Sequence, residues 1–230
     1  MMEFFEESIF FGVVLSIFAY GLGCLMHQKF KLALFNPLML SIAIIILILL
    51  VSHIDYDVYY SGAKYLSYFL TPATVCLAVP LYEKLELLKG NWKAILAGIL
   101  SGVLTSLCSI FVMSRFFHLS HKEYVTLLPK SITTAIGMGV SQELNGYVTL
   151  TVAIIIITGV LGNILAPLVC RIGKIQNPIA KGIAIGTASH AIGTAKAMEI
   201  GKIEGAMSSL SIVVSGFLTV ILAPFFAPFI

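Results

Sequence analysis

Two short polar stretches, LLPKSITTAIGMG (Leu127–Gly139) and GTASHAIGTAKAME (Gly186–Glu199), decide the fold that this sequence predicts. Each interrupts strongly apolar sequence, and each carries cationic or titratable side chains: Lys130 in the first, His190 and Lys196 in the second. Polar, Gly- and Pro-interrupted segments persist at membrane depth only where they face protein or a water-filled cavity. We therefore expect both stretches to line a solute site inside a helical membrane protein.

The composition around these stretches is that of an integral membrane protein. Of 230 residues, 59% are hydrophobic and 11% charged, whereas soluble domains have about 25% charged residues. Ile42–Val51 is an unbroken apolar run, unlike the alternating strands of about 10 residues in outer-membrane barrels. The net charge of +3 is scattered, so nucleic acid is not an expected partner. The expected fold class is all-α: a polytopic helical membrane protein.

No motif in the sequence indicates an enzyme, a cofactor or a metal site. The sequence contains no HExxH, GxSxG or GxxxxGK[ST]. Ser189 and His190 are adjacent, which would direct their side chains about 100° apart on a helix, a poor nucleophile–base arrangement. Four cysteines occur singly in apolar runs, without CxxC spacing, and read as small core residues: Cys24, Cys76, Cys108 and Cys170.

Six segments approach the length of about 20 apolar residues that a membrane span needs: Ser8–Met26, Leu32–Ser52, Ala63–Tyr82, Trp92–Phe117, Tyr147–Cys170 and Ala206–Ile230. The acidic start MMEFFEES lacks the basic region of a signal peptide, so the first span is expected to remain as an anchor. Lys- and Arg-rich loops place the N-terminus outside the cell. The stretch Glu123–Leu144 must then start and end on one side, as a re-entrant hairpin or a pair of short helices.

A similarity at an offset of 57 residues predicts internal repeats. SGVL at Ser101–Leu104 recurs as TGVL at Thr158–Leu161 and as SGFL at Ser215–Leu218. Twice this offset is almost half the chain, so residues 1–115 and 116–230 are expected to be two repeats within one domain, 1–230. The alternative is chance similarity between Gly-containing apolar segments, and the topology alone does not establish that the repeats are inverted.

Helix breaks in matching positions of internal repeats mark the substrate sites of secondary transporters. We expect such breaks at five positions: Pro72, Pro129, Gly137, Gly186 and Gly193. Other glycines, among them Gly98 and Gly102, are interpreted as close contacts between helices.

Lys130 is the first candidate for binding a solute. A lysine within a membrane segment is costly unless it is paired or hydrated, which makes it a functional candidate; the alternative is a lysine that snorkels at the outer interface. Neighbouring hydroxyls would bind the substrate or satisfy carbonyls at the helix break. The candidates are Ser131, Thr133 and Thr134, with Thr74 in the corresponding upstream segment.

His190 is the second candidate. Thr187, His190 and Thr194 fall at i, i+3 and i+7 on one helical stripe, with Ser189 beside them. Histidine titrates near physiological pH, so His190 could couple proton movement to solute movement. The alternative is a neutral histidine hydrogen-bonded between helices. Lys196 either adds a cation to the site or pairs with Glu199.

Three long segments resemble the LrgB/CidB family of holin-like and antiholin-associated membrane proteins, the CidB branch most closely: PLYEKLELLKGNW (Pro80–Trp92), TLLPKSITTAIGMGVSQELNG (Thr126–Gly146) and NPIAKGIAIGTASHAIGTAKAMEIGKIEGAMSS (Asn177–Ser209). The resemblance extends from about Ile9 to Phe229. It implies a bacterial inner-membrane protein that works beside a small holin-like partner of the LrgA/CidA type and modulates murein hydrolase activity and autolysis. It supplies no catalytic residues.

Relatives in plastids move glycolate and glycerate, and some bacterial relatives act in pyruvate or acetate handling. The plastid proteins carry an LrgA-like half on the same chain; this sequence lacks one, so a separate partner is implied. We expect a secondary transporter of small monocarboxylates, which are attracted by half-helix N-termini and by cationic side chains, with an indirect effect on autolysis. The alternative is a holin-like regulator that transports nothing. Membrane lipid is expected to surround the helices. Their Gly-rich faces would also permit a homodimer.

Overall fold

The computed structural model describes residues 10–30, 36–76 and 78–230, and every secondary-structure element within these ranges is a helix. Four described helices are long and apolar enough to cross a membrane: α2 (Phe11–Phe30), α7 (Leu85–Phe116), α10 (Val148–Ile172) and α12 (Lys202–Phe226) with the short η1 (Ala227–Phe229). The prediction of an all-α, polytopic membrane protein is confirmed. The chain forms two compact units, Met1–Cys76 and Leu77–Ile230.

The N-terminal unit packs α2 against α3 (Pro37–Val51) and α4 (Tyr56–Ser67). Asn36 begins α3, because its Oδ1 accepts hydrogen bonds from the backbone N–H groups of Leu38 and Met39 while Pro37 occupies the first turn. With 15 residues, α3 is shorter than the predicted second span. The first residues of that span and of the first one, from Leu32 and from Ser8, lie outside the described residues.

The predicted third span is interrupted between α4 and α5 (Leu70–Cys76), and Pro72 and Pro80 lie inside α5 and α6 (Ala78–Glu83) rather than at a break. Residue 77 lies outside the described residues. α4 ends at Ser67. The break after α4 precedes Pro72, which lies in the first turn of α5, where its missing N–H leaves no hydrogen bond unmade. Thr74 lies in α5, and its side chain falls outside the described part of the structure.

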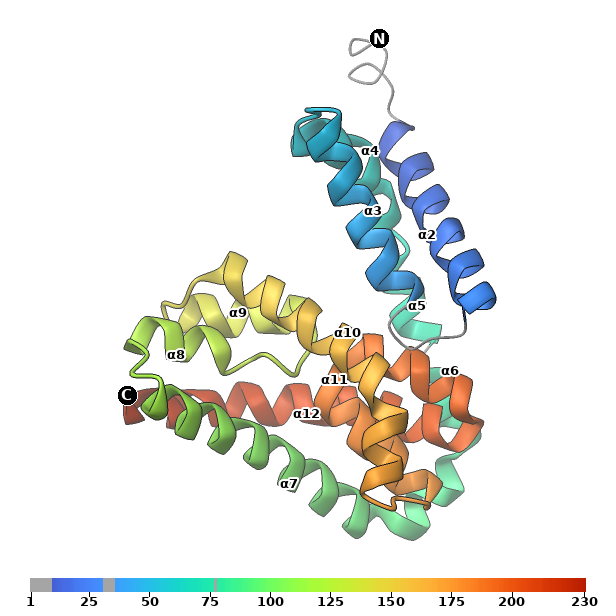
Figure 1. The fold of residues 1–230 in the computed structure, drawn as a ribbon. Helices are drawn as coiled ribbons and strands as arrows, with labels where there is room; N and C mark the ends of the chain where they lie inside the picture. The colour runs from blue at the N-terminus through green and yellow to red at the C-terminus, as the bar shows by residue number, and fades with distance from the viewer. Residues whose placement is uncertain (1–9, 31–35, 77) are drawn as a thin grey trace. The chain divides into compact units, whose positions relative to one another are not determined.

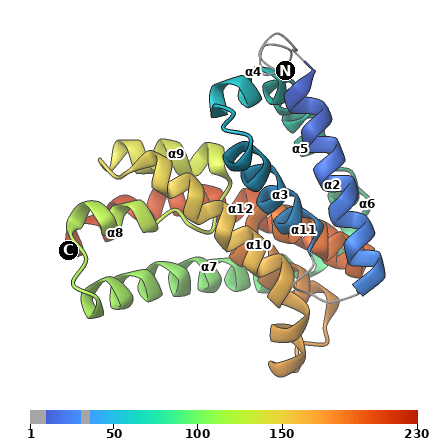
Figure 2. The ribbon, with the colours of Figure 1, turned by 45° about the horizontal axis from the view of Figure 1, so that its top comes forward.

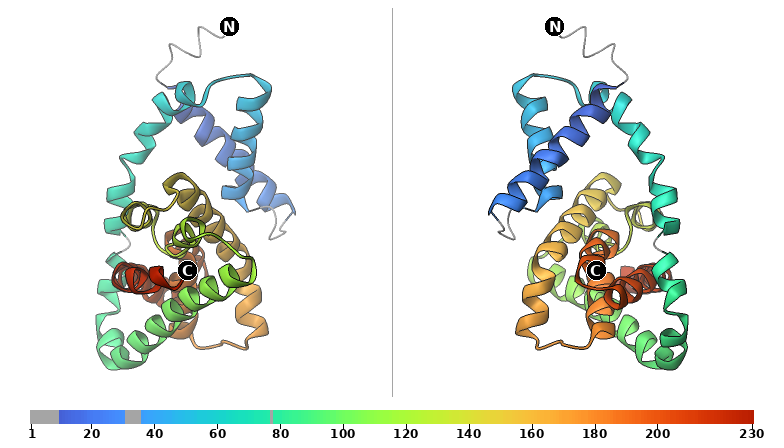
Figure 3. Two further views of the ribbon diagram at one scale, coloured as in Figure 1. Left: turned by 90° about the vertical axis from the view of Figure 1, so that its left-hand side faces the viewer. Right: turned by 90° about the vertical axis from the view of Figure 1, so that its right-hand side faces the viewer.

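The C-terminal unit is built on three long helices. α7 and α12 end together beside α8 (His121–Leu127) (Figure 1). The Tyr124 hydroxyl donates to the Phe226 carbonyl at 3.0 Å, and His121 Nδ1 lies 3.0 Å from a main-chain oxygen of Ile230. The C-terminus lies beside α8 in the other views as well (Figures 2 and 3). α7 and α12 are therefore parallel.

α8 and α9 (Thr134–Glu143) form a hairpin whose two ends lie at the same place. The backbone N–H of Tyr147, just before α10, donates to Thr126 Oγ1 at 2.8 Å. Thr151 Oγ1 lies 3.0 Å from the Thr126 carbonyl oxygen and 2.7 Å from Ser141 Oγ. The end of α8, the end of α9 and the start of α10 therefore lie together. The chain runs away from this point after α8 and returns to it through α9. The expected reversal within Glu123–Leu144 is present, and Pro129 lies in the non-helical turn between the two helices.

α11 (Pro178–Ile200) is a second hairpin, which the sequence analysis did not predict. Its backbone reverses at His190, with φ 41° and ψ −140°. The first half runs alongside α12, with Gly186 against Ser208. In the second half Thr194 Oγ1 lies 2.6 Å from Ser208 Oγ, and Met198 packs against Gly205. Residues before and after His190 thus contact the same turns of α12, so the two halves lie side by side in opposite directions.

The three helix breaks predicted at glycines are also wrong in position. Gly137 lies within α9, and Gly186 and Gly193 lie within the two halves of α11. These glycines serve close packing: a side chain at Gly137 would meet Ile155, and one at Gly186 would meet the Ser208 backbone. A glycine therefore did not locate the break, because its lack of a Cβ serves helix contact as readily as a turn.

The 57-residue offset of the sequence relates these elements. Adding 57 to the residue numbers of the α8–α9 hairpin, 121–143, gives 178–200, the α11 hairpin. Adding 57 to those of α10, 148–172, gives 205–229, which lies in α12 and η1. α10 runs from the α11 tip, where Ile155 meets His190, to its base, where Cys170 shares a hollow with Lys181; α12 runs the opposite way. The two hairpin-plus-helix segments are therefore inverted. The division into repeats 1–115 and 116–230 stays a prediction.

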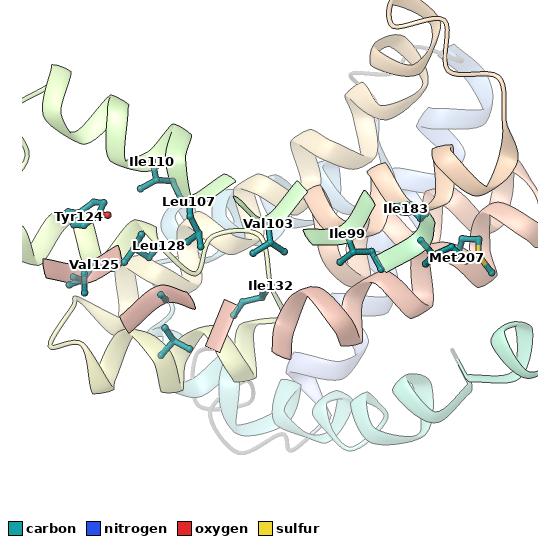
Figure 4. Close-up of a cluster of buried hydrophobic side chains, with 14 of the residues drawn as sticks. Ile99, Val103, Leu107, Ile110, Tyr124, Val125, Leu128, Ile132, Ile183 and Met207 are labelled. Carbon is teal, nitrogen blue, oxygen red and sulfur yellow. The ribbon is translucent and has the colours of Figure 1, made fainter. Parts of the chain in front are cut away.

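The core of the C-terminal unit joins one face of α7 to the α8–α9 turn and to the α11–α12 pair. Ile99, Val103 and Leu107 of α7 gather with Ile132 and Met207 in one buried cluster (Figure 4). The spacing of four residues along α7 directs these side chains to one side of the helix. A neighbouring face of α7, made of small and hydroxyl residues, is left for the cavity described next.

Candidate functional site

A cavity of about 690 Å³ lies between α7, the turn that joins α8 to α9, and the first half of α11. α7 contributes small and polar residues at helical spacing: Asn91, Gly98, Ser101, Gly102, Thr105 and Ser106. The α8–α9 turn contributes Lys130 and Ser131, and α11 contributes Thr187 near its tip. Both hairpins, which enter the unit from opposite ends, therefore reach this cavity.

Among the described residues, Lys130 is the only charged side chain that lines the cavity. Its Nζ donates to Ser131 Oγ at 3.0 Å, and Ser131 Oγ is 3.2 Å from Ser106 Oγ. Across the described ranges the one salt bridge is elsewhere, between Lys196 and Glu199, so Lys130 faces the cavity without a carboxylate partner. A partly buried ammonium group without a counter-ion favours the entry of an anion.

Thr187 offers a second polar group at the same cavity. It is 5% exposed, and its Oγ1 is buried without a hydrogen-bond partner among the described residues. Gly102 of α7 makes room for it, since a Cβ there would lie 2.7 Å from the Thr187 methyl group. Leaving a buried hydroxyl unpaired costs about 1–3 kcal/mol. A ligand that accepts this hydrogen bond would recover that free energy.

The remaining hydroxyls of the α7 face are already paired with their own helix. Ser101 Oγ donates to the Gly98 carbonyl at 2.8 Å, and Thr105 Oγ1 donates to the Ser101 carbonyl at 2.7 Å. Because each proton is engaged, these hydroxyls present oxygen lone pairs to the cavity. The cavity thus combines a hydrogen-bond donor at Lys130 with acceptors along α7, and the unpaired Thr187 hydroxyl is buried beside it.

His190 points away from this cavity. Its side chain is 3% exposed, and Nε2 lies 2.9 Å from the Ile155 carbonyl oxygen on α10. A carbonyl can only accept, so Nε2 carries the proton in this contact. The ring also lies against Gly159, where a Cβ would come within 2.7 Å of it. This geometry is that of a histidine bonded between helices; its role in proton coupling stays a prediction.

The other expected residues serve the hairpins. Thr194 Oγ1 donates to the His190 carbonyl at 2.9 Å, across the backbone reversal. Ser189 is buried against Gly162 and Gly193. Lys196 Nζ pairs with Glu199 Oε2 at 2.8 Å, which is the structural alternative considered for it.

Of the expected binding residues, the cavity brings together Lys130, Ser131 and Thr187. The following lie in the same unit but outside its lining: Thr133, Thr134, Ser189, His190, Thr194 and Lys196. Thr133 precedes α9 as its N-cap residue without a side-chain hydrogen bond.

The α7 face is the part of the site that the sequence analysis missed. Ser101 and Thr105 line the cavity, and Gly98 and Gly102, interpreted as helix contacts, also open onto it. The available signal was the spacing of small and hydroxyl residues along one stripe beside the apolar stripe of Ile95 and Ile99.

The described residues contain no group of three or more His, Cys, Asp or Glu side chains placed to hold a metal ion.

Comparison with known proteins gives one family. The profile of the LrgB-like family matches residues 16–229. The antiholin-like proteins LrgB of Bacillus cereus (strain B4264) and Bacillus anthracis (strain A0248) are each 36% identical to this chain over 222 residues, covering 96% of this chain and 96% of each relative. No solved structure matches the chain.

Proposed function

The chain belongs to the LrgB-like family, and we propose that it carries small monocarboxylates of the pyruvate, glycolate or acetate kind across the membrane. The observation that carries this proposal is that Lys130, the single cation among the described residues lining the cavity, has no carboxylate partner. In this proposal the chain is a transporter and not an enzyme.

The chemistry of the cavity suits a small carboxylate. Lys130 Nζ would bind one carboxylate oxygen, and the free hydroxyl of Thr187 would donate to the other. Charge-assisted hydrogen bonds contribute about 1.5–3 kcal/mol each. The acceptor oxygens of Ser101 and Thr105 would receive the hydroxyl of a 2-hydroxy acid. A cavity of about 690 Å³ falls within the usual range of ligand sites, roughly 300–1,000 Å³.

The arrangement of the hairpins supports transport rather than static binding. The α8–α9 and α11 hairpins enter from opposite ends of the C-terminal unit, and both contact Ile155: its side chain lies next to Gly137 and its carbonyl oxygen next to His190. Inverted repeats with broken helices around one site are the architecture by which secondary transporters expose a substrate to each side in turn. The solute would pass between the two tips.

The relatives carry the name antiholin-like protein. In our proposal this chain affects murein hydrolases and autolysis indirectly, through the movement of acidic metabolites across the bacterial inner membrane. A holin-like partner of the LrgA/CidA type, a homodimer, an N-terminus outside the cell and a closest likeness to the CidB branch belong to the same proposal. The second candidate function, favoured by the relatives' name, is a holin-like regulator that transports nothing.

Uptake of labelled pyruvate or glycolate into proteoliposomes tests the transport proposal, with and without the partner and with an imposed proton gradient. Lys130→Gln should lower the apparent affinity about 10- to 100-fold, as expected for loss of a charge-assisted hydrogen bond. Lys130→Arg should restore part of it. Lys196→Gln is the matched control, because this lysine pairs with Glu199 and lies outside the cavity.

Absence of uptake under every condition would contradict transport. The two candidate functions separate in cells: a Lys130→Gln chain that no longer transports but keeps its full effect on lysis would favour the regulator. Loss of both effects together would favour the transporter.

A further inference from the structure

A second hollow, of about 380 Å³, lies where α10 meets α11. Arg171 and Lys174 come from the end of α10 and the turn after it, and Lys181 comes from the first turns of α11. The rest of the lining is mostly apolar: Pro167, Cys170, Ile175 and Ile200, with Gln176. The hollow has no part in the transport proposal.

The three cations have no acidic partner. No Asp or Glu lines the hollow, and throughout the described ranges no salt bridge involves Arg171, Lys174 or Lys181. The last carbonyls of α10 attract nearby positive charge, which accounts for one cation at this place but not for three from two helices. Like charges that share a hollow repel one another unless an anion lies between them.

Side chains, and not a helix terminus, must supply the binding. The N-terminus of α11 is already capped, because Asn177 Oδ1 accepts from the N–H groups of Ile179 at 2.9 Å and Ala180 at 3.2 Å. The turn holds Lys174 in a left-handed conformation with φ 51°. Such a backbone is unfavourable for a lysine, yet it closes the short connection that brings Lys174 towards Lys181.

The surroundings identify the kind of anion. Leu168, Val169 and Ile172 of α10 are 49%, 56% and 73% exposed beside the hollow, and Pro167 and Ile200 continue this apolar surface into it. In a membrane protein this surface faces acyl chains. A free anion would use only the charge, whereas an anionic lipid would use the charge and the apolar surface together.

We propose that Arg171, Lys174 and Lys181 bind the phosphate of an anionic phospholipid headgroup, while its acyl chains lie along the exposed face of α10. Basic pockets between membrane helices on the cytoplasmic side bind such headgroups, and the Lys/Arg distribution of the sequence predicts that side for this loop.

The test uses the purified full chain and a fluorescent anionic phospholipid in nanodiscs of phosphatidylcholine. Each basic residue near a membrane surface contributes about fivefold to the binding of anionic lipid, so the triple variant Arg171→Gln, Lys174→Gln, Lys181→Gln should bind roughly 100-fold more weakly. Lys84→Gln, Lys89→Gln, Lys93→Gln makes the same charge change elsewhere in the unit and should bind like the natural protein.

Two further measurements distinguish an anionic lipid from free phosphate as the ligand and exclude unfolding as the cause of lost binding. Inorganic phosphate at millimolar concentration should leave lipid binding unchanged; complete displacement by it would assign the hollow to free phosphate and overturn the lipid proposal. Equal binding by both triple variants would also overturn it. The charge-preserving Arg171→Lys, Lys174→Arg, Lys181→Arg chain must retain binding, which separates lost charge from lost folding. Lys130→Gln must bind lipid normally, so failure of transport and failure of this site remain distinguishable.

Discussion

His190 Nε2 lies 2.9 Å from the carbonyl oxygen of Ile155, which ties the tip of the α11 hairpin to the middle of α10. The same turn of α10 packs its Ile155 side chain against Gly137 of α9. One residue therefore contacts both hairpins close to the cavity.

Replacing His190 by alanine should destabilise the protein by about 1–3 kcal/mol, because it removes the buried hydrogen bond between Nε2 and the Ile155 carbonyl oxygen. His190→Gln keeps an N–H donor and should recover part of the loss. Thermal unfolding in detergent measures both. If His190→Ala kept its stability but lost the response of transport to a proton gradient, the ring would be a proton carrier rather than a tie.

Gly186→Ala should destabilise by about 1–3 kcal/mol, since its Cβ would collide with the Ser208 backbone, which has no space to move. Gly139→Ala is the matched control, because nothing lies within 4 Å of the added Cβ. As an open position inside a helix, it should be neutral or more stable by up to about 1 kcal/mol. Equal melting temperatures for the two variants would contradict the close α11–α12 contact.

Thr187→Val should not destabilise the empty protein, because it removes a buried hydroxyl that has no partner among the described residues. The same change should weaken carboxylate binding about 5- to 10-fold, as expected for loss of one hydrogen bond. Thr194→Val is the control: its hydroxyl bonds the His190 carbonyl, so stability should fall by about 1 kcal/mol. A Thr187→Val protein with unchanged affinity would exclude this hydroxyl from the site.

The start of α8 should respond to acid. Glu123 Oε2 accepts from the Ser120 hydroxyl and from the Ser120 backbone N–H, each at 2.7 Å, and these hydrogen bonds lower the pKa of Glu123 below its ordinary value of 4.5. Because the folded pKa is the lower one, the stabilisation is complete above 4.5 and disappears as the pH falls through the folded pKa.

Melting curves of the natural protein and Glu123→Gln should therefore differ at neutral pH and converge in acid. The expected difference is small, since Glu123 is fully exposed. A difference that grew as the pH fell would show that the carboxylate does not act through this capping box.

Much of the fold follows from the sequence by itself. Apolar runs of about 20 residues require helices that satisfy their own backbone hydrogen bonds in lipid, and the Lys/Arg distribution required Glu123–Leu144 to reverse. The 57-residue offset relates the α8–α9 hairpin and α10 to the α11 hairpin and α12. Lys130 was identified because a lone lysine in such a segment needs a partner or a ligand.

The tertiary structure decided where the chain reverses and which side chains meet. The sequence of α11 gave no sign that its turn is at His190 rather than at Gly186 or Gly193, because the choice depends on which glycines α12 must approach and on the Ile155 carbonyl that receives the imidazole. The same packing separates Lys130 from His190 and brings Lys130 together with Thr187 and the small and hydroxyl residues of α7. Local sequence sets the helices and their charges, but a cavity exists only through the contacts between distant segments that surround it.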